Sequence, residues 1–190
     1  MKVRSLPMKK QKVITIAGMP GAGKGIVSMA ASSRGIPVLV CGNVIREETT
    51  RRGLEQTPEN MGKVMLEIRQ EEGSAVVADR LIPKIESSKS RVVVVEGVRS
   101  MAEVKALRKK HAVVIVGVHA SPKTRYERLR ARARSDDPKD WEEFLERDSR
   151  ELSVGVGNVI ALAEEMLTNE TSVEDLTVAS EHMLAKVVQE

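Results

Sequence analysis

Several residue types are scarce in this chain of 190 residues, and each scarcity excludes a class of protein. A single cysteine, Cys41, excludes an internal disulfide framework and is compatible with the cytosol. No apolar run approaches the roughly 20 residues that a membrane-spanning helix needs, so we expect a cytoplasmic protein with no membrane partner. The 31 basic and 27 acidic residues leave a net charge of +4, which by itself indicates no particular partner.

Aromatic residues make up 2% of the chain, and all three lie in one stretch of the sequence. Because 41% of the residues are hydrophobic, the chain can build one globular domain, whose core must be largely aliphatic. Tyr126, Trp141 and Phe144 therefore mark an unusual segment. Since Trp141 and Phe144 are one helical turn apart, we expect them to pack within that segment, with stacking on a nucleotide base as the alternative.

The start of the chain is expected to be a loose extension, residues 1–11, ahead of a domain that spans residues 12–190. Its basic residues meet the apolar segment Val13–Ala17 without a long hydrophobic stretch or a cleavage site. This order argues against a secretory signal.

Five segments are rich in β-branched residues or apolar enough to be strands, the last of them weakly so. The first four are almost continuously apolar, as in parallel strands that are buried on both faces. Helical stretches separate them, which predicts a three-layer α/β fold with about five parallel strands and helices on both faces. Ligands of such sheets bind beyond the carboxyl ends of the strands. The expected strands are Lys12–Ala17, Pro37–Cys41, Arg91–Glu96, Ala112–His119 and Glu165–Thr168.

Helix starts are marked by four sequence signals. Thr57 and Ser121 each precede a proline, as helix caps often do. Two further pairs, Ser100 with Glu103 and Thr171 with Glu174, have the spacing of a capping box.

The region from about residue 130 to residue 158 departs from this alternation and is expected to be a helical lid insert that moves. It is highly charged, contains a short helix capped by Asp140, and carries glycines at 155 and 157.

The segment that follows the first strand has the chemistry of a phosphate-binding loop. Its spacing, GxxxxGK, lets backbone N–H groups converge on phosphate oxygens, while the next helix directs its positive end at the same anion. Lys24 would reach the β and γ phosphates of ATP. With this loop between its first strand and a helix, the three-layer α/β fold is expected to be a P-loop NTPase fold. The expected nucleotide contacts are Gly18, Met19, Pro20, Gly21, Ala22, Gly23, Lys24, Gly25 and Ile26.

Gly25 occupies the position at which Ser or Thr usually binds Mg²⁺ in such loops, and the next hydroxyl is that of Ser28. We therefore expect Mg²⁺ to be held mainly by nucleotide oxygens, water and a carboxylate elsewhere. Glu96, at the end of an otherwise apolar strand, is the candidate metal ligand.

The sequence resembles adenylate kinase and its nucleoside monophosphate kinase relatives. Gly18–Gly25 has the adenylate kinase glycine after the lysine, although Ile26 stands where that family has threonine. Gly42–Arg46 is similar to the family's Gly-Asp-x-x-Arg segment, with Asn43 in place of the aspartate. Glu96–Arg99 looks like its Asp-Gly-x-x-Arg element, shortened by one residue.

Two further segments complete this resemblance. Val113–Pro122 and the arginine-rich helix after it resemble the strand, turn and helix that lead into the adenylate kinase lid. Asn169, Ser172, Glu174 and Leu176 instead resemble the end of dephospho-CoA kinases. The matches cover most of residues 12–178, and the chain looks like an archaeal family described as adenylate-kinase-related or dephospho-CoA-kinase-like.

The resemblance implies a binding site for the acceptor. It assigns the acceptor's phosphate to Arg46 and Arg99, with Asn43 in the same pocket. Guanidinium groups suit this task because they bind phosphate through two parallel hydrogen bonds.

Phosphoryl transfer requires two anions to be aligned and their charge neutralised. On a helix from Ser121, the residues Arg125, Arg128 and Arg132 share one face, and Arg147 and Arg150 could approach from the other side. The alternative without a phosphate role is that these arginines lie on a solvated helix surface. Their partners would then be Asp136, Asp137, Glu142 and Glu143. The expected catalytic residues are Lys24, Glu96, Arg128, Arg132 and Arg147.

The leading interpretation is thus an ATP- and Mg²⁺-dependent phosphotransferase that acts on a small nucleotide-like acceptor, with a nucleoside monophosphate favoured over dephospho-CoA. The alternative is an ATPase or a nucleotide-dependent RNA-associated factor. Five arginines crowded into residues 125–134 leave this open, although nucleic acid is not favoured as a partner. The acceptor base and the oligomeric state are not fixed by the sequence.

Overall fold

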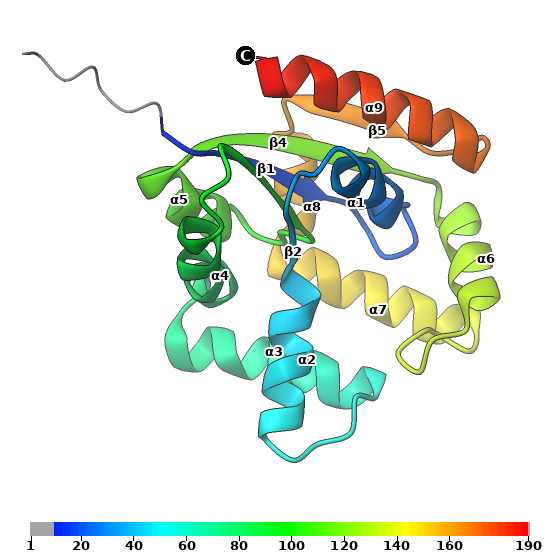
Figure 1. Ribbon diagram of the computed structural model, residues 1–190. Helices are drawn as coiled ribbons and strands as arrows, with labels where there is room; N and C mark the ends of the chain where they lie inside the picture. The colour runs from blue at the N-terminus through cyan, green and yellow to red at the C-terminus, as the bar shows by residue number, and fades with distance from the viewer. Residues whose placement is uncertain (1–9, 190) are drawn as a thin grey trace, which may run out of the picture.

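The computed structural model describes residues 10–189, so most of the expected N-terminal extension lies outside the described residues. Five parallel strands form one sheet in the order β2-β3-β1-β4-β5, which confirms the predicted fold class (Figure 1). The four longer expected strands keep their bounds to within one residue. The strands are β1 (Lys12–Ala17), β2 (Val38–Val40), β3 (Val92–Glu96), β4 (Ala112–His119) and β5 (Glu165–Thr168).

The second strand is shorter than predicted, because Cys41 already begins helix α2 (Cys41–Arg51). Cys41 is buried in the core, and burial raises the pKa of its thiol, as expected of a packing residue rather than a nucleophile.

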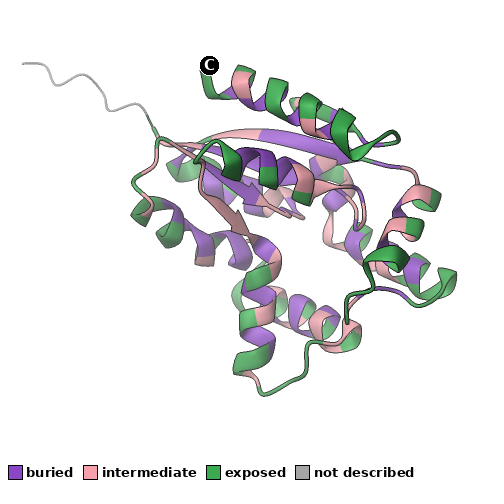
Figure 2. Ribbon diagram, turned by 45° about the vertical axis from the view of Figure 1, so that its right-hand side comes forward, coloured by how far each residue is buried: buried purple, intermediate pink, exposed green. Residues whose placement is uncertain are grey.

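Helices cover both faces of the sheet (Figure 1). On one face, Ile14 and Ile16 of β1 pack against α1 (Lys24–Ser33) and α9 (Val173–Gln189). On the other face, Val13 and Ala17 share a larger apolar cluster with residues of several helices. Among these helices are α4 (Val76–Ser87), α5 (Met101–Lys110) and α8 (Val156–Ala161). The central strands are almost entirely buried, whereas the helices each present one exposed side (Figure 2).

The remaining helices stand beyond the carboxyl ends of the strands. Helix α2 and helix α3 (Pro58–Glu72) lie on one side, and α6 (Pro122–Arg132) and α7 (Trp141–Val154) lie on the other (Figure 1). The buried carboxylate of Glu48 on α2 accepts hydrogen bonds from Arg51, Arg52 and Arg80, which ties α2 to α4. The carboxyl ends of the strands are therefore flanked by two pairs of helices, α2 with α3 and α6 with α7.

The region predicted as a lid contains more regular structure than expected. Its helix α7 has 14 residues rather than being short, and it ends at Gly155, whose φ of 111° starts the turn into α8. The segment 133–140, between α6 and α7, is the non-helical part. The mobility of this region stays a prediction.

Most of the predicted helix caps are confirmed. Thr57, Ser121 and Asp140 each accept a backbone hydrogen bond at a helix start, and Ser100 forms a capping box with Glu103. The capping box predicted at Thr171 and Glu174 was wrong by one residue. The box is instead formed one position later, where Ser172 and Asp175 exchange hydrogen bonds of 3.1 and 3.3 Å.

The three aromatic rings form one cluster between α6 and α7. Ring centroids of Tyr126, Trp141 and Phe144 lie 5.0–5.5 Å apart, and Phe144 is fully buried while Trp141 remains 41% exposed. Packing within the insert is thereby confirmed.

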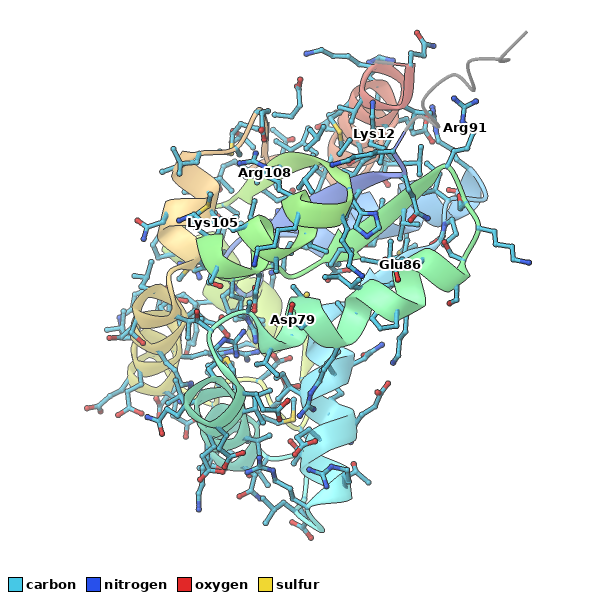
Figure 3. All side chains as sticks on the ribbon, turned by 90° about the vertical axis from the view of Figure 1, so that its left-hand side faces the viewer. Lys12, Asp79, Glu86, Arg91, Lys105 and Arg108 are labelled. Atoms are coloured by element: carbon cyan, nitrogen blue, oxygen red, sulfur yellow. The ribbon has the colours of Figure 1, made fainter. Side chains whose placement is uncertain are left out.

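The strands begin at the edge of the sheet opposite to these two pairs of helices. Lys12 and Arg91 lie at that edge, next to the starts of β1 and β3, whereas Lys105 and Arg108 belong to α5 (Figure 3).

None of the helices among residues 10–189 is long and apolar enough to cross a membrane.

Candidate active site

The loop between β1 and α1 has the backbone of an anion cradle. Gly21 and Gly23 adopt φ values of 80° and 104°, in the left-handed region that favours glycine. A Cβ atom on Gly18 would lie 2.6 Å from the carbonyl oxygen of Val118, so this position also requires glycine. Because the first N–H groups of α1 have no acceptor within the helix, the loop can bind a phosphate chain.

Lys24 lies folded over this loop. Its ammonium donates hydrogen bonds to the carbonyl oxygens of Gly18 and Met19, at 2.8 and 3.1 Å. Part of the residue is exposed, but burial of the ammonium lowers its pKa to about 8, and the nearby carboxylate of Glu96 opposes this shift. An arriving phosphate would supply the charge partner that the ammonium lacks.

Arg125 supports the loop from behind and does not face the cleft. It is 3% exposed, donates to the carbonyl oxygen of Pro20 at 3.2 Å, and forms a two-pronged ion pair with Asp148 on α7, at 2.8 and 2.5 Å. Its guanidinium also lies over the ring of Phe144. The expectation that Arg125 shares a cleft-facing surface with Arg128 and Arg132 was therefore wrong, because the inner turn of α6 is buried.

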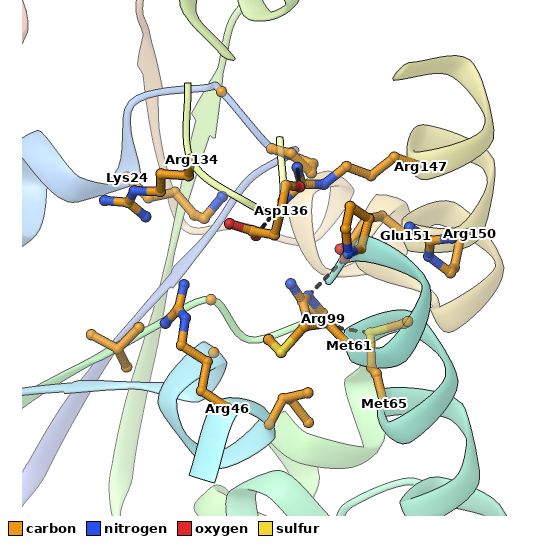
Figure 4. A pocket seen from close by; sticks show the side chains of 18 of the residues that line it. Lys24, Arg46, Met61, Met65, Arg99, Arg134, Asp136, Arg147, Arg150 and Glu151 are labelled. Carbon is orange, nitrogen blue, oxygen red and sulfur yellow. Dashed lines mark hydrogen bonds and ion pairs between the residues drawn. The ribbon is translucent and has the colours of Figure 1, made fainter. Parts of the chain in front are cut away.

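One side of the cleft combines cations with an apolar wall (Figure 4). Arg46 of α2 lines the cleft, and its Nη1 donates to the side chain of Asn43 at 2.8 Å. Arg99 lines it too, held by an ion pair of 2.7 Å with Glu151. The wall is formed by Val40, Ile45, Met61 and Met65.

Arginines from α6 and α7 enter from the other side. Arg132 forms a two-pronged ion pair with the buried Asp137, and Arg147 contacts both Asp137 and Asp136, at 3.2 and 3.3 Å. Burial acts to raise the pKa of Asp137, but the hydrogen bonds from Arg132 hold it below its ordinary value. These carboxylates fix the two guanidinium groups at the mouth of the cleft.

Glu96 ends β3 beside Lys24 and lines the same cleft. Its Oε2 accepts a hydrogen bond of 2.5 Å from the hydroxyl of Ser28. No group of three or more histidine, cysteine or acidic residues that could hold a metal occurs among residues 10–189. One carboxylate fits Mg²⁺ of the kind that keeps several waters and binds mainly to nucleotide phosphates.

The structure thus brings together seven of the predicted side chains in one cleft and leaves five apart. Asn43 is exposed beside Arg46, Ile26 packs against the core, and Arg128 donates to Asn169 at 3.0 Å instead of lining the cleft. The side chains of two loop residues, Met19 and Ala22, do not line it either. The seven that line the cleft are Pro20, Lys24, Arg46, Glu96, Arg99, Arg132 and Arg147.

Sequence reasoning missed Glu151 and the two methionines. Glu151 follows Arg150 in a helix full of acidic residues, so nothing in the sequence singles it out. Met61 and Met65 are four residues apart, a spacing that shows a shared helix face but not that this face borders the cleft.

Comparison with known proteins places the chain in a family. A family model described as "AAA domain" matches residues 17–146. The UPF0200 protein of Hyperthermus butylicus is 50% identical over 175 residues, which span 92% of this chain and 94% of that protein.

Solved structures share the fold at lower identity. TT1252 from Thermus thermophilus has a TM-score of 0.62 and 23% identity, covering 94% of this chain and 99% of that chain. Shikimate kinase from Acinetobacter baumannii, in complex with shikimate, has a TM-score of 0.58 and 15% identity, covering 96% and 94%. The fold of these two proteins is shared across nearly the whole chain, and by its sequence the protein belongs to the UPF0200 family, with an AAA domain over residues 17–146.

Proposed function

We propose that the protein is a phosphotransferase that binds ATP at the loop Gly18–Lys24 and transfers its γ-phosphoryl group to a small nucleotide-like acceptor. A nucleoside monophosphate is the favoured acceptor. The observation that carries this proposal is the composition of a single cleft. It joins the loop lysine to six arginines and to an apolar wall on β2, α2 and α3.

The residues of the cleft divide into a donor side and an acceptor side. The loop amides and Lys24 would bind the β and γ phosphates of ATP, while Arg46 and Arg99 would bind the acceptor's phosphate. Met61 and Met65 offer a polarisable wall for a flat base, since thioethers make favourable contacts with aromatic rings. This arrangement suits an acceptor with one anionic and one apolar end.

Transfer would proceed by in-line displacement. An oxygen of the acceptor forms a bond to the γ phosphorus as the bond from that phosphorus to the β–γ bridging oxygen breaks, and ADP leaves. Arg132 and Arg147, held by Asp137, would neutralise the charge on the phosphoryl group in the transition state of transfer. Mg²⁺, when bound with ATP, would contribute charge neutralisation at the β and γ phosphates, and Glu96 is the residue that would hold it.

Two observations bear on the acceptor. The cleft-lining cations outnumber the carboxylates that line the cleft or pair with those cations, seven to four, which favours a phosphorylated acceptor over a neutral one. The contact between Asn169 and the carbonyl oxygen of Ala22, at 2.9 Å, involves a residue by which the sequence resembles dephospho-CoA kinases. Dephospho-CoA therefore remains the second candidate.

The proposal is tested by incubating the protein with Mg-ATP and, separately, AMP, CMP, UMP, GMP or dephospho-CoA. Chromatography follows the phosphorylated product and free phosphate. We expect a product with one acceptor that disappears in Lys24→Ala. Phosphate release that is indifferent to every acceptor would instead identify an ATPase. RNA binding that weakens steeply with salt would favour an RNA-associated factor.

A further inference from the structure

The phosphate-binding loop lacks the hydroxyl that usually follows its lysine. Gly25 has no side chain, and Ile26 packs its side chain into the core. The next hydroxyl on α1 belongs to Ser28, which is 7% exposed and therefore cannot reach solvent freely. Its Oγ donates a hydrogen bond of 2.5 Å to Oε2 of Glu96 across the boundary between α1 and β3.

Gly25 differs from the other glycines of the loop in what surrounds it. Cβ atoms on Gly18 and Gly23 would lie 2.6 and 2.2 Å from neighbouring atoms, whereas a Cβ atom on Gly25 would meet nothing within 4 Å. The φ of Gly25 is also outside the positive region, since only Gly21 and Gly23 of the loop are found there. Neither backbone conformation nor packing requires glycine at this position.

Glu96 is held at one oxygen only. Ser28 binds Oε2, whereas Oε1 has no hydrogen-bond partner among residues 10–189. The carboxylate lines the cleft, and of the nearby carboxylates it acts most strongly to raise the pKa of Lys24. A hydrogen bond from a buried hydroxyl fixes the rotamer of such a carboxylate and leaves the second oxygen for a ligand.

We propose that Ser28 is a positioning residue for Glu96, and that the pair takes over the task of the hydroxyl that position 25 lacks. The usual hydroxyl binds Mg²⁺ itself. Here the hydroxyl of Ser28 would orient an oxygen of Glu96 toward the Mg²⁺ that accompanies ATP, so the carboxylate replaces the missing ligand. This inference rests on the proposed function, because it concerns the metal of the same nucleotide. It concerns binding alone and does not require any acceptor to be phosphorylated.

The decisive experiment measures metal affinity directly. Mn²⁺ is titrated into the protein saturated with a non-hydrolysable ATP analogue, and free Mn²⁺ is followed by electron paramagnetic resonance. In Ser28→Ala we expect the Mn²⁺ dissociation constant to rise about 10-fold, the usual effect of losing an outer-shell partner of a metal ligand. Binding of the analogue without metal should change less than about twofold, because the loop amides and Lys24 are untouched.

Two further variants separate positioning from general damage. In a Glu96→Gln background, Ser28→Ala should add nothing, since the hydroxyl acts through the carboxylate. Gly25→Ser places a hydroxyl in open space, and we expect it to restore the Mn²⁺ affinity of Ser28→Ala. Ser180→Ala is the matched control, because that serine is also buried, on α9, but its hydroxyl donates to the carbonyl oxygen of Leu176 and not to a carboxylate.

The outcomes are distinct. Unchanged Mn²⁺ affinity in Ser28→Ala overturns the inference, as does an equal loss in the Glu96→Gln background. If Ser28→Ala does not fold, Ser28→Cys decides instead. Its thiol is a weak hydrogen-bond donor, so Mn²⁺ binding should weaken, and unchanged Mn²⁺ affinity would overturn the inference. Failure of the acceptor panel would refute the proposed transferase yet leave this metal measurement fully informative.

Discussion

Nucleotide binding should depend on pH through Lys24. Burial lowers the pKa of this ammonium to about 8, against 10.5 for an ordinary lysine. In the nucleotide-free protein the Lys24 side chain therefore loses its positive charge within an accessible pH range. A bound triphosphate stabilises the charged form, and binding therefore requires the protein to take up or retain one proton. The affinity for ATP must fall as pH rises above 8.

The size of this effect follows from the fraction of protonated lysine. With a pKa of about 8, that fraction falls from about 0.76 at pH 7.5 to about 0.03 at pH 9.5, so the affinity should drop about 25-fold. This corresponds to about 1.9 kcal/mol of binding free energy. With an unperturbed lysine the change over the same range would be about 10%.

The assay is calorimetric titration of a non-hydrolysable ATP analogue at half-unit pH steps. Lys24→Arg is the control, since guanidinium keeps its charge throughout, and its affinity should be flat across the range. A flat profile for the native protein would refute the reasoning, because it would mean that the ammonium is not desolvated in the free state.

The same burial makes a prediction about stability. Because the folded-state pKa of Lys24 is lowered, the folded protein disfavours the charged form, and this cost is present in full below pH 8. It declines as pH rises from 8 and is gone above about 10.5, where the unfolded chain is neutral too. Lys24→Met should therefore be more stable than the native protein at pH 7, by on the order of 1–3 kcal/mol, with the difference disappearing at high pH. Equilibrium unfolding in urea at pH 7 and pH 10.5 measures this difference.

Two predictions concern packing around the loop. Asp148→Ala should lower the free energy of unfolding in urea by about 3–5 kcal/mol, because it leaves the buried guanidinium of Arg125 without its partner, whereas Arg108→Ala in an exposed pair should cost less than 1 kcal/mol. A loss below 1 kcal/mol for Asp148→Ala would contradict the assigned burial. Gly23→Ala should lower stability and weaken nucleotide binding, because the new Cβ atom would lie 2.2 Å from Nδ2 of Asn169 at a φ of 104°. Gly25→Ala is its control in thermal melts and should be neutral or stabilising by up to about 1 kcal/mol.

The sheet could be predicted because its signal is local and repeated. Val92–Val95 and Val113–Val118 are continuous β-branched or apolar runs, which only parallel strands buried on both faces explain economically. The end of the second strand was harder to predict, since Cys41 and Gly42 suit a strand end or a helix start equally well. Tertiary packing of α2 decides between them.

The candidate site was predictable only as far as single residues carry fixed chemistry. The loop glycines and Lys24 have a spacing that defines their geometry, so their arrangement followed from the sequence. Which arginines line the cleft could not be predicted. Arg125 and Arg132 look alike in the sequence, and they differ only in which turn of α6 faces the protein interior. The Ser28–Glu96 hydrogen bond joins residues 68 positions apart and has no local signal at all.

The aromatic cluster has a practical consequence for anyone who works with this protein in solution. With Trp141 and its two neighbours as the only aromatic side chains, all indole and phenol fluorescence and nearly all near-ultraviolet absorption arise where α6 meets α7. The sheet and helices α2 and α3 contain no tryptophan, tyrosine or phenylalanine and contribute nothing to these signals. Emission from the native chain is therefore a label-free reporter of the α6–α7 arm alone, and a tryptophan introduced into α3 of a Trp141→Phe variant would report on the opposite wall.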